Sequence, residues 1–292
     1  MEKVDLDFIV TPKLISPFRY VGGKRNMVKQ ILPLIPEHLQ YIEPYCGSGA
    51  IFFSKTRSKI EVLNDINSDI VNFFRVLQNE ELAEKLVEKL VFTPYSYEEF
   101  KLAGSIVYGE EEDLVLRAWG WFVLYNQGFG GTGDRNSWGK TKTLVSRNIS
   151  DNVNSWRGRL KLLEFWMDRL QSVQIEHRDA LECIQYWDTP TSFFYLDPPY
   201  VRSTRKKTLY THETNDAHHQ RLVDILLSLK GRFVLSGYWN DLYSPLLEIC
   251  ERINIDRAIS VTGRTKDYPA SGTSSITSNP EKMRVETLLV KR

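Results

Sequence analysis

Short apolar runs alternate along the chain with longer stretches in which apolar residues recur at helical spacing. The short runs are rich in β-branched and aromatic residues, which predicts buried strands. These runs occupy residues 41–43, 60–63, 173–177, 193–196, 233–236, 253–256 and 285–290. Helical spacing is clearest at residues 67–90 and 216–229. Strands that alternate with helices predict an α/β fold with a mostly parallel sheet.

Residues 93–166 interrupt this alternation. Helical patterns at 96–103, 113–125 and 154–166 flank a glycine-rich polar centre, NQGFGGTGDRNSWGKTKT, and no buried strand is evident. We therefore expect an inserted, largely helical subdomain with a loop or hairpin, between the two parts of a main domain at 1–92 and 167–292. Residues 262–282 are rich in Ser, Thr and Gly, which predicts a long loop between the last two strands.

Composition is that of an ordinary soluble protein. Of the 292 residues, 42% are hydrophobic and 26% charged. No apolar run approaches the roughly 20 residues of a membrane span, and the first residues lack the layout of a secretory signal. We expect a cytoplasmic protein with no membrane partner. The widely spaced Cys46, Cys183 and Cys250 fit neither a disulfide framework nor a zinc site, so we expect reduced thiols and no metal.

Basic residues are unevenly distributed on a chain whose net charge is only +1. Residues 135–161 contain seven Lys or Arg against one acid, and residues 200–210 contain four and no acid. Such patches can mark a face that contacts phosphates. From charge alone, they can equally be solvated surface.

The segment EPYCGSGAIFF follows the first predicted strand. Gly47 and Gly49 in it indicate a tight strand-to-helix turn whose backbone can approach a ligand closely. Asp65 follows the second strand, roughly 20 residues after the glycine turn. An acid at that position can bind a ribose diol. Together they favour a nucleoside-type cofactor, and no Walker lysine follows the glycines. The glycines alone are also compatible with a purely structural turn.

Two further positions have both a structural and a ligand-binding interpretation. Asp179 begins a predicted helix, where it can be an N-cap or can bind an adenine amino group in the same cleft. Lys24 follows a glycine pair in PFRYVGGK, which can simply cap a helix. Alternatively, Lys24 and Tyr20 lie against the charged end of a cofactor.

The segment FFYLDPPY ends a buried strand in an acid. Asp197 and the backbone carbonyl of Pro198 can accept both hydrogens of an exocyclic amino group, which makes its lone pair available for attack. Proline restricts the backbone, so the carbonyl is held in place. Tyr200 can stack on a base flipped out of the duplex. A strand that ends in a proline turn is the structural alternative.

These motifs in this order, GGK, EPYCGSG, NDIN, a basic insertion and DPPY, resemble the Dam-like family of DNA adenine-N6 methyltransferases. The segments YTHETNDAHHQ and LSGYWNDLY resemble later parts of that family. The resemblance implies a Rossmann-like methyltransferase sheet with an antiparallel C-terminal strand. It also implies S-adenosylmethionine as the cofactor of the main domain, and an insertion at 93–166 that recognises DNA.

The resemblance also implies roles for individual residues. Tyr20 and Lys24 would lie near the methionine part of the cofactor, above a loop formed by Glu43, Tyr45, Gly47 and Gly49. Asp65 would bind the ribose hydroxyls, and Asp179 with Ala180 the adenine. The target base would be held by Asp197, Pro198, Pro199 and Tyr200, with Asp197 also bordering the cofactor.

The insertion departs from the better-known family members, because their recognition hairpin is not recognisable in GFGGTGDRNSWGKTKT. The recognition sequence therefore stays open. Side chains suited to phosphates and base edges make double-stranded DNA the expected partner. The candidate contacts are Arg135, Asn136, Lys140, Lys142 and Arg205. We expect a monomer or a weak dimer.

We expect direct transfer of a methyl group to adenine N6, without a covalent enzyme intermediate. Cytosine N4 poses the same chemical problem and is the nearest alternative, although an aspartate at the first position of DPPY is associated chiefly with adenine. A protein glutamine methyltransferase would leave the basic insertion without a purpose. A catalytically silent DNA-binding module would not need Gly47, Gly49, Asp65 and Asp197 together.

Overall fold

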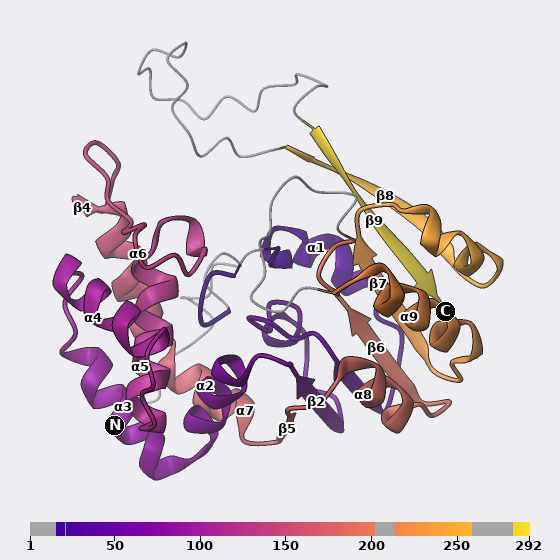
Figure 1. Cartoon of the computed structure of the whole chain (residues 1–292), viewed down its shortest axis with the longest axis horizontal. Coiled ribbons are helices and arrows are strands. Elements are labelled where there is room, and N and C mark those ends of the chain that lie inside the picture. The colour runs from indigo at the N-terminus through magenta and orange to yellow at the C-terminus, as the bar shows by residue number, and fades with distance from the viewer. Residues whose placement is uncertain (1–15, 21, 202–213, 259–282) are drawn as a thin grey trace.

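The computed structural model describes residues 16–20, 22–201, 214–258 and 283–292, and Figure 1 shows the course of the chain. Its centre is a seven-stranded sheet in the order β5-β2-β1-β6-β7-β9-β8. The strands of this sheet are β1 (Gln40–Glu43), β2 (Ile60–Asn64), β5 (Val173–Glu176), β6 (Ser192–Leu196), β7 (Arg232–Gly237), β8 (Glu251–Ala258) and β9 (Met283–Lys291). All pairs from β5 to β7 are parallel, whereas β9 is antiparallel to both neighbours. The predicted Rossmann-like α/β sheet with an antiparallel C-terminal strand is confirmed.

Helices surround this sheet and fill the region between β2 and β5. They are α1 (Val28–Ile31), α2 (Ser68–Gln78), α3 (Glu80–Val91), α4 (Tyr97–Val107), α5 (Leu114–Gln127), α6 (Asp151–Leu160), α7 (Leu163–Leu170), α8 (Ala180–Trp187) and α9 (Asp216–Ser228). A 3-10 turn, Lys24–Met27, leads into α1. Among the helices within the described ranges, none has the length and apolarity that crossing a bilayer requires.

Apolar side chains pack on both faces of the sheet. On one face, α8 and α9 cover β6 and β7, and their buried residues include Leu181 and Leu222 (Figure 1). On the other face, α2 contributes Phe73 and Phe74 to a larger cluster. Burial on both faces is why the parallel strands are nearly continuous apolar runs in the sequence.

The helices of residues 93–166 lie to one side of the sheet in Figure 1, with a short hairpin of β3 (Val145–Ser146) and β4 (Ile149–Ser150). They share the larger apolar cluster with the sheet. In α5, the Trp121 ring lies 5.8 Å from that of Phe18, and Tyr125 lies 5.6 Å from Tyr20. Because the packing is continuous, the boundaries of a recognition subdomain stay a proposal.

Two predicted helical stretches are divided in the structure. Residues 67–90 form α2 and α3, because Asn79 adopts an extended conformation and its side chain caps α3. Residues 154–166 likewise belong to α6 and α7, and α7 continues past the predicted boundary at residue 166. The predicted loop at 262–282 lies outside the described residues.

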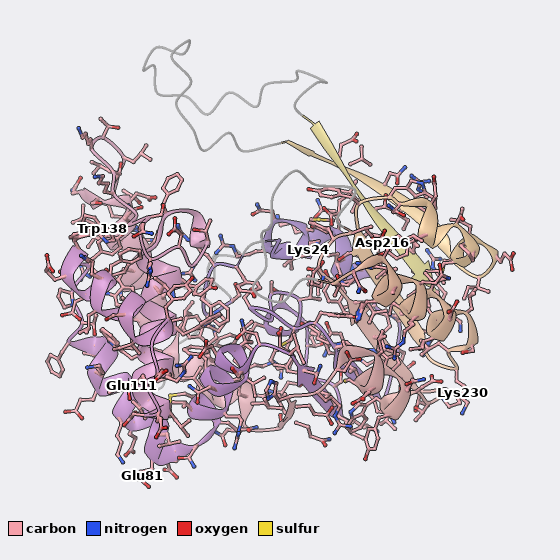
Figure 2. The ribbon with its side chains drawn as sticks, viewed as in Figure 1. Lys24, Glu81, Glu111, Trp138, Asp216 and Lys230 are labelled. Carbon is pink, nitrogen blue, oxygen red and sulfur yellow. The ribbon has the colours of Figure 1, made fainter. Side chains whose placement is uncertain are left out.

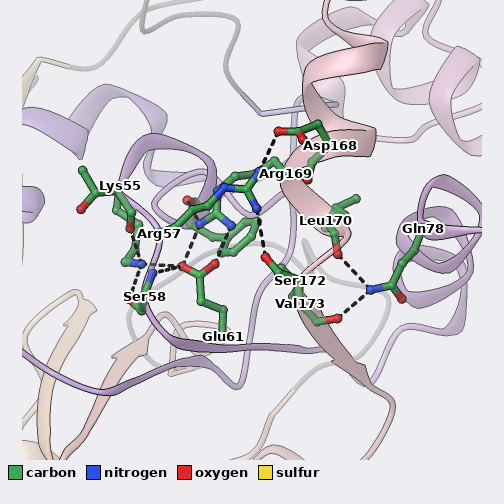
Figure 3. A network of polar contacts seen from close by, with 12 residues as sticks. Lys55, Arg57, Ser58, Glu61, Gln78, Asp168, Arg169, Leu170, Ser172 and Val173 are labelled. Atoms are coloured by element: carbon green, nitrogen blue, oxygen red, sulfur yellow. Dashed lines mark hydrogen bonds and ion pairs between the residues drawn. The ribbon is translucent and has the colours of Figure 1, made fainter.

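A buried ionic network attaches α7 to β2 of the sheet (Figure 3). Glu61 on β2 is 1% exposed and accepts hydrogen bonds from Arg169 of α7 at 2.5 and 2.8 Å. Lys55 donates to the same carboxylate at 2.6 Å. Arg57 pairs with Asp168 beside it, at 2.7 Å. These contacts fix the helix that links the inserted helices to β5.

Candidate active site

A cavity of about 520 Å³ opens where β1, β2, β5 and β6 end. That volume lies within the roughly 300–1,000 Å³ typical of ligand pockets. Most of the predicted site residues line it, namely Tyr20, Lys24, Glu43, Tyr45, Gly47, Asp65, Asp179, Ala180, Asp197 and Pro199. Segments far apart in the sequence therefore meet at the carboxyl ends of the strands, where parallel α/β folds bind ligands.

Asn64 ties three of these strand ends together. Its buried side chain donates to the carbonyls of Pro44 and Arg178 at 2.9 and 3.1 Å, and accepts from the Arg178 amide. The segments after β1, β2 and β5 are thereby held in one arrangement. In the sequence, Asn64 only marks the end of a strand, so its role in tying these segments together was not predicted.

The glycines after β1 have the left-handed backbone that the sequence predicted, but a 3-10 turn, Phe52–Ser54, follows them in place of the predicted helix. Gly47 and Gly49 have φ angles of 49° and 63°, a region that favours glycine. A Cβ atom at Gly47 would lie 3.3 Å from the Tyr20 ring, which shows how closely that ring covers the turn. The Gly47 amide donates to Asp65 Oδ2 at 2.8 Å. Asp65 therefore braces the turn as well as lining the cavity.

Glu43 is a buried acid at the end of β1. It is 1% exposed and accepts a hydrogen bond of 2.6 Å from the Tyr41 hydroxyl. Burial raises the pKa of Glu43 to about 8, against the lowering effect of that hydrogen bond. An acid held in this way at the cavity wall is suited to a positively charged ligand, which would restore its ionised form.

Asp179 caps α8 and also lines the cavity. Its Oδ1 accepts from the amides of Leu181 and Glu182 at 2.8 and 3.4 Å. Both interpretations of Asp179 are thus compatible with its position. Opposite, the start of α9 contributes His218, whose Nε2 lies 2.8 Å from the Tyr45 hydroxyl.

Asp197 is anchored by an ionic network at the end of β6. It forms an ion pair with Lys24, which also lies 3.3 Å from Glu286 Oε1. Lys24 and Glu286 are 2% and 0% exposed, and Figure 2 shows Lys24 between the sheet and the inserted helices. Ser236 at the end of β7 donates to Asp197 Oδ1 at 3.1 Å. The carboxylate of Asp197 is therefore held from two sides.

The charges in this network are tuned by burial and by each other. Burial raises the pKa of Asp197, although Lys24 opposes that effect. Burial disfavours the charged form of Lys24, but Asp197 first, and then Tyr200, Tyr195 and Glu286, raise its pKa well above the usual range. Lys24 is thus a permanent cation, and Asp197 is a better hydrogen-bond acceptor than an exposed aspartate.

Tyr200 belongs to the same network. Its hydroxyl accepts from Lys24 and donates to Glu286, both at 3.1 Å, and its ring lies 4.5 Å from that of Tyr238. Tyr200 is 8% exposed, and neither it nor Pro198 is among the residues that line the cavity. The Pro199 carbonyl accepts from Thr214 at 3.0 Å. Stacking of Tyr200 on a base stays a prediction.

The predicted DNA contacts in the insertion are solvent-exposed, namely Arg135, Asn136, Lys140 and Lys142. Arg205 lies outside the described residues. One correction concerns Arg159, which the charge count placed in the basic patch of 135–161. It is only 1% exposed, so it is not part of that surface.

Several site residues were not found from the sequence. Glu286 is an acid within an apolar run, VETLLV, which is a signal for a buried polar site. Ser236 ends the strand beside β6, and that position could have identified it. Thr214, Asn215 and His218 precede or begin α9, where only the topology places them opposite the glycine turn.

A cavity at the ends of parallel strands, beside a glycine turn, is the place where doubly wound sheets bind nucleotide-like cofactors. The DPPY carboxylate projects into that same space. Fold and site together define a group-transfer enzyme of the Rossmann-like methyltransferase class.

Comparison with known proteins gives the family. The family model for D12 class N6 adenine-specific DNA methyltransferases matches residues 20–257, from the aromatic residue before the glycine pair into β8. The chain belongs to this family. Adenine, rather than the cytosine considered above, is the base in the family's description.

Individual relatives agree with this family. A DNA N-6-adenine-methyltransferase of Escherichia phage P1 is 26% identical over 74% of this chain and 28% of the relative. A DNA adenine methylase of Vibrio cholerae is 27% identical over 83% of this chain and 78% of the relative. The Type II methyltransferase M1.LlaDCHI of Lactococcus lactis is 29% identical, over 90% and 93%. The match thus spans less than a third of the phage relative and most of the other two.

Proposed function

We propose that this chain is a site-specific enzyme that transfers the methyl group of S-adenosylmethionine to N6 of an adenine flipped out of double-stranded DNA. The observation that carries the proposal is the position of Asp197. It ends β6 at the cavity, forms an ion pair with Lys24 and accepts from Ser236. DNA as substrate also favours a cytoplasmic protein, and we propose a monomer or weak dimer.

The cavity residues fit this cofactor. When bound, S-adenosylmethionine supplies an electrophilic methyl group on a positively charged sulfur. Glu43 and Asp197, two acids that line the cavity, favour a cation there. Asp65 is placed for ribose hydroxyls, and Asp179 for an adenine amino group. Gly47 lines the cavity without a side chain, whereas Gly49 is not among the lining residues and packs against Phe53.

Asp197 activates the target amine by accepting one of its hydrogens. The Pro198 carbonyl accepts the other, so the nitrogen lone pair leaves conjugation with the ring and is aimed at the methyl group. The raised pKa of Asp197 strengthens it as an acceptor. One N6 proton then leaves to solvent by way of Asp197. Lys24 and Ser236 hold the carboxylate in position throughout.

The target base and its strand would be held by the remaining motif residues and the insertion. Pro199 and Tyr200 follow Asp197 in the DPPY motif. Tyr200 would need to present its ring face to stack on a flipped base. Exposed Arg135, Asn136, Lys140 and Lys142 would contact phosphates or base edges. Arg205, which follows DPPY, is a further candidate contact.

Nucleoside mass spectrometry of DNA from a host that expresses the protein tests this function. We expect N6-methyladenine above the level of a host without the gene, at one sequence context when the DNA is sequenced for modified bases. Methylation confined to cytosine N4, or no methylation by a protein that binds S-adenosylmethionine, would refute the proposal.

A further inference from the structure

A chain of hydrogen bonds links the DPPY turn to the buried face of α9. The Thr214 hydroxyl donates to the Pro199 carbonyl at 3.0 Å. The same oxygen lies 3.0 Å from His219 Nε2, and Nδ1 of that ring lies 2.8 Å from the Tyr243 hydroxyl. Thr214 and Pro199 line the cavity, whereas His219 is 0% and Tyr243 is 6% exposed. The chain of bonds therefore runs from the wall of the site into the core.

The number of hydrogens along this chain assigns a direction to each bond. A hydroxyl has one hydrogen, and that of Thr214 points to the Pro199 carbonyl. The Thr214 oxygen must therefore accept from Nε2–H of His219. In a neutral ring, Nδ1 then has no hydrogen and accepts from the Tyr243 hydroxyl. A single neutral tautomer of His219 thus satisfies every bond in the chain.

This chain holds the backbone of the DPPY turn. The two prolines have no N–H group, so neither can anchor the turn by donating a hydrogen bond. Asp197 is anchored through its side chain, as described above. The bond from Thr214 acts instead on the carbonyl of Pro199. Because Pro198 and Tyr200 adjoin Pro199, a displaced Pro199 would move both the carbonyl and the ring that are assigned to the target base.

We propose that Thr214 and His219 are positioning residues, which hold the DPPY turn in the shape that receives the flipped base. Thr214 acts directly on the turn, and His219 acts through Thr214. A histidine that only filled the core would not need a bond to a residue of the cavity wall, and His219 has one. The inference rests on the proposed function, because that function supplies the base.

Thr214→Val tests the proposal directly, because it removes the hydroxyl and keeps the branched shape of the side chain. It should lower kcat about tenfold or more, since a small misplacement of the reacting groups slows the reaction. Thr214→Ser retains the hydroxyl and should recover most of that loss. In both variants, calorimetric affinity for S-adenosylmethionine should stay within a few-fold of the wild type.

Base flipping gives a readout that a merely structural role would not change. A duplex with the fluorescent analogue 2-aminopurine in place of the target adenine emits more strongly when that base leaves the stack. The duplex carries the sequence context in which the wild type methylates. At saturating protein, Thr214→Val should give a smaller increase in emission than the wild type or Thr214→Ser.

Thr93→Val is the matched control. Thr93 is also a buried threonine whose hydroxyl donates to a carbonyl, that of Lys89, and accepts from a ring nitrogen, Nε1 of Trp119. It is not among the residues that line the cavity. We expect Thr93→Val to lower the Tm, as Thr214→Val does, but to leave kcat and the emission unchanged.

Two replacements of His219 separate its two bonds. His219→Gln can place an amide N–H near the position of Nε2 and so keep the donor to Thr214. His219→Asn can replace only Nδ1, which faces Tyr243. Both variants should lose stability, but kcat should be clearly higher in His219→Gln. Equal kcat in the two variants would exclude His219 as a residue that acts through Thr214.

Three outcomes bear on the proposal and on the function beneath it. An unchanged kcat in Thr214→Val, or an equal loss in Thr93→Val, would overturn the positioning role. A loss of S-adenosylmethionine affinity as large as the loss of kcat would make Thr214 a cofactor contact, which also overturns it. A wild type that methylates no DNA would instead refute the proposed function.

Discussion

Lys24 shows at the scale of a single residue how the site is organised. The sequence suggested a contact with the cofactor, and the structure adds the ion pair with Asp197 and the proximity to Glu286. The two carboxylates lie around one ammonium, and Asp197 is the one of the two among the residues that line the cavity. This arrangement depends on a lysine that is itself almost fully buried.

Replacing Lys24 should affect both stability and pH dependence. Lys24→Met removes the ammonium that pairs with Asp197 and lies beside Glu286, and we expect a loss of about 3–5 kcal/mol of unfolding free energy in urea. The pKa of Asp197 should rise further, which shifts the pH–rate profile to higher pH. Adding Glu286→Gln should restore part of the stability.

Lys55→Met is the matched control for this variant. Lys55 is also buried against a carboxylate, that of Glu61, but away from the cavity. We expect it to lose stability without moving the pH–rate profile. The same pH shift in both variants would contradict the role assigned to Lys24.

Glu43 should couple cofactor binding to pH. Because its pKa is raised to about 8, Glu43 is mostly neutral at pH 6.5 and ionises as the pH rises through 8. A positively charged cofactor binds the ionised form better, so affinity for S-adenosylmethionine should increase from pH 6.5 to pH 8.5. Calorimetry on Glu43→Gln should show a weaker and much flatter dependence. An equally steep dependence in that variant would exclude Glu43 as the origin.

At the scale of an element, the N-cap of α8, Asp179, is also a candidate ligand for the cofactor. Asp179→Ala should remove the N-cap and cost about 1 kcal/mol of stability. Asp179→Ser should retain the cap, because a hydroxyl can accept from the Leu181 amide as the carboxylate does. If Asp179 also binds the cofactor's adenine, both variants should lose affinity for S-adenosylmethionine. Wild-type affinity in Asp179→Ser would leave only the cap.

The sequence predicted the elements well where burial sets the pattern. Every strand of the large sheet was predicted within two residues at its ends, and the signal is clearest for β6 and β7, which are continuously apolar because both of their faces are covered. The break between α2 and α3 was missed, since Asn79 lies within an unbroken apolar periodicity and acts only through its capping conformation. A helical spacing of apolar residues does not reveal that one residue within it adopts an extended conformation.

At the scale of the whole molecule, the network around Glu61 attaches the inserted helices to the sheet. Although burial favours its neutral form, hydrogen bonds from Arg169 and Lys55 lower the pKa of Glu61. Its contribution is therefore present above the ordinary value of 4.5 and is lost as the pH falls through the lowered pKa. Glu61→Gln should cost about 3–5 kcal/mol at pH 7, and less in acid.

Chemical denaturation measures that cost, with Glu81→Gln as the control. The Glu81–Lys85 pair is a single exposed contact within α3, so its loss should leave the midpoint nearly unchanged. Equal midpoints for the two variants would mean that the buried network does not stabilise the junction.

Site residues could be predicted from the sequence where they belong to short local motifs, but not where they depend on contacts between distant segments. The glycine turn, Asp65 and DPPY are local motifs at strand ends, and a parallel sheet brings such ends together. The positions of Glu286 and Arg159 depend on contacts between distant segments that no local pattern encodes. The basic patch at 135–161 is also only partly exposed, because the packing of α6 buries Arg159.

The central claim is that Asp197 at the end of β6 activates adenine N6. Asp197→Ala should be compared with the wild type for two quantities, calorimetric affinity for S-adenosylmethionine and transfer of labelled methyl groups to DNA. We predict affinity within a few-fold of the wild type and no transfer above background. Transfer at the wild-type rate by a folded Asp197→Ala protein would contradict the claim.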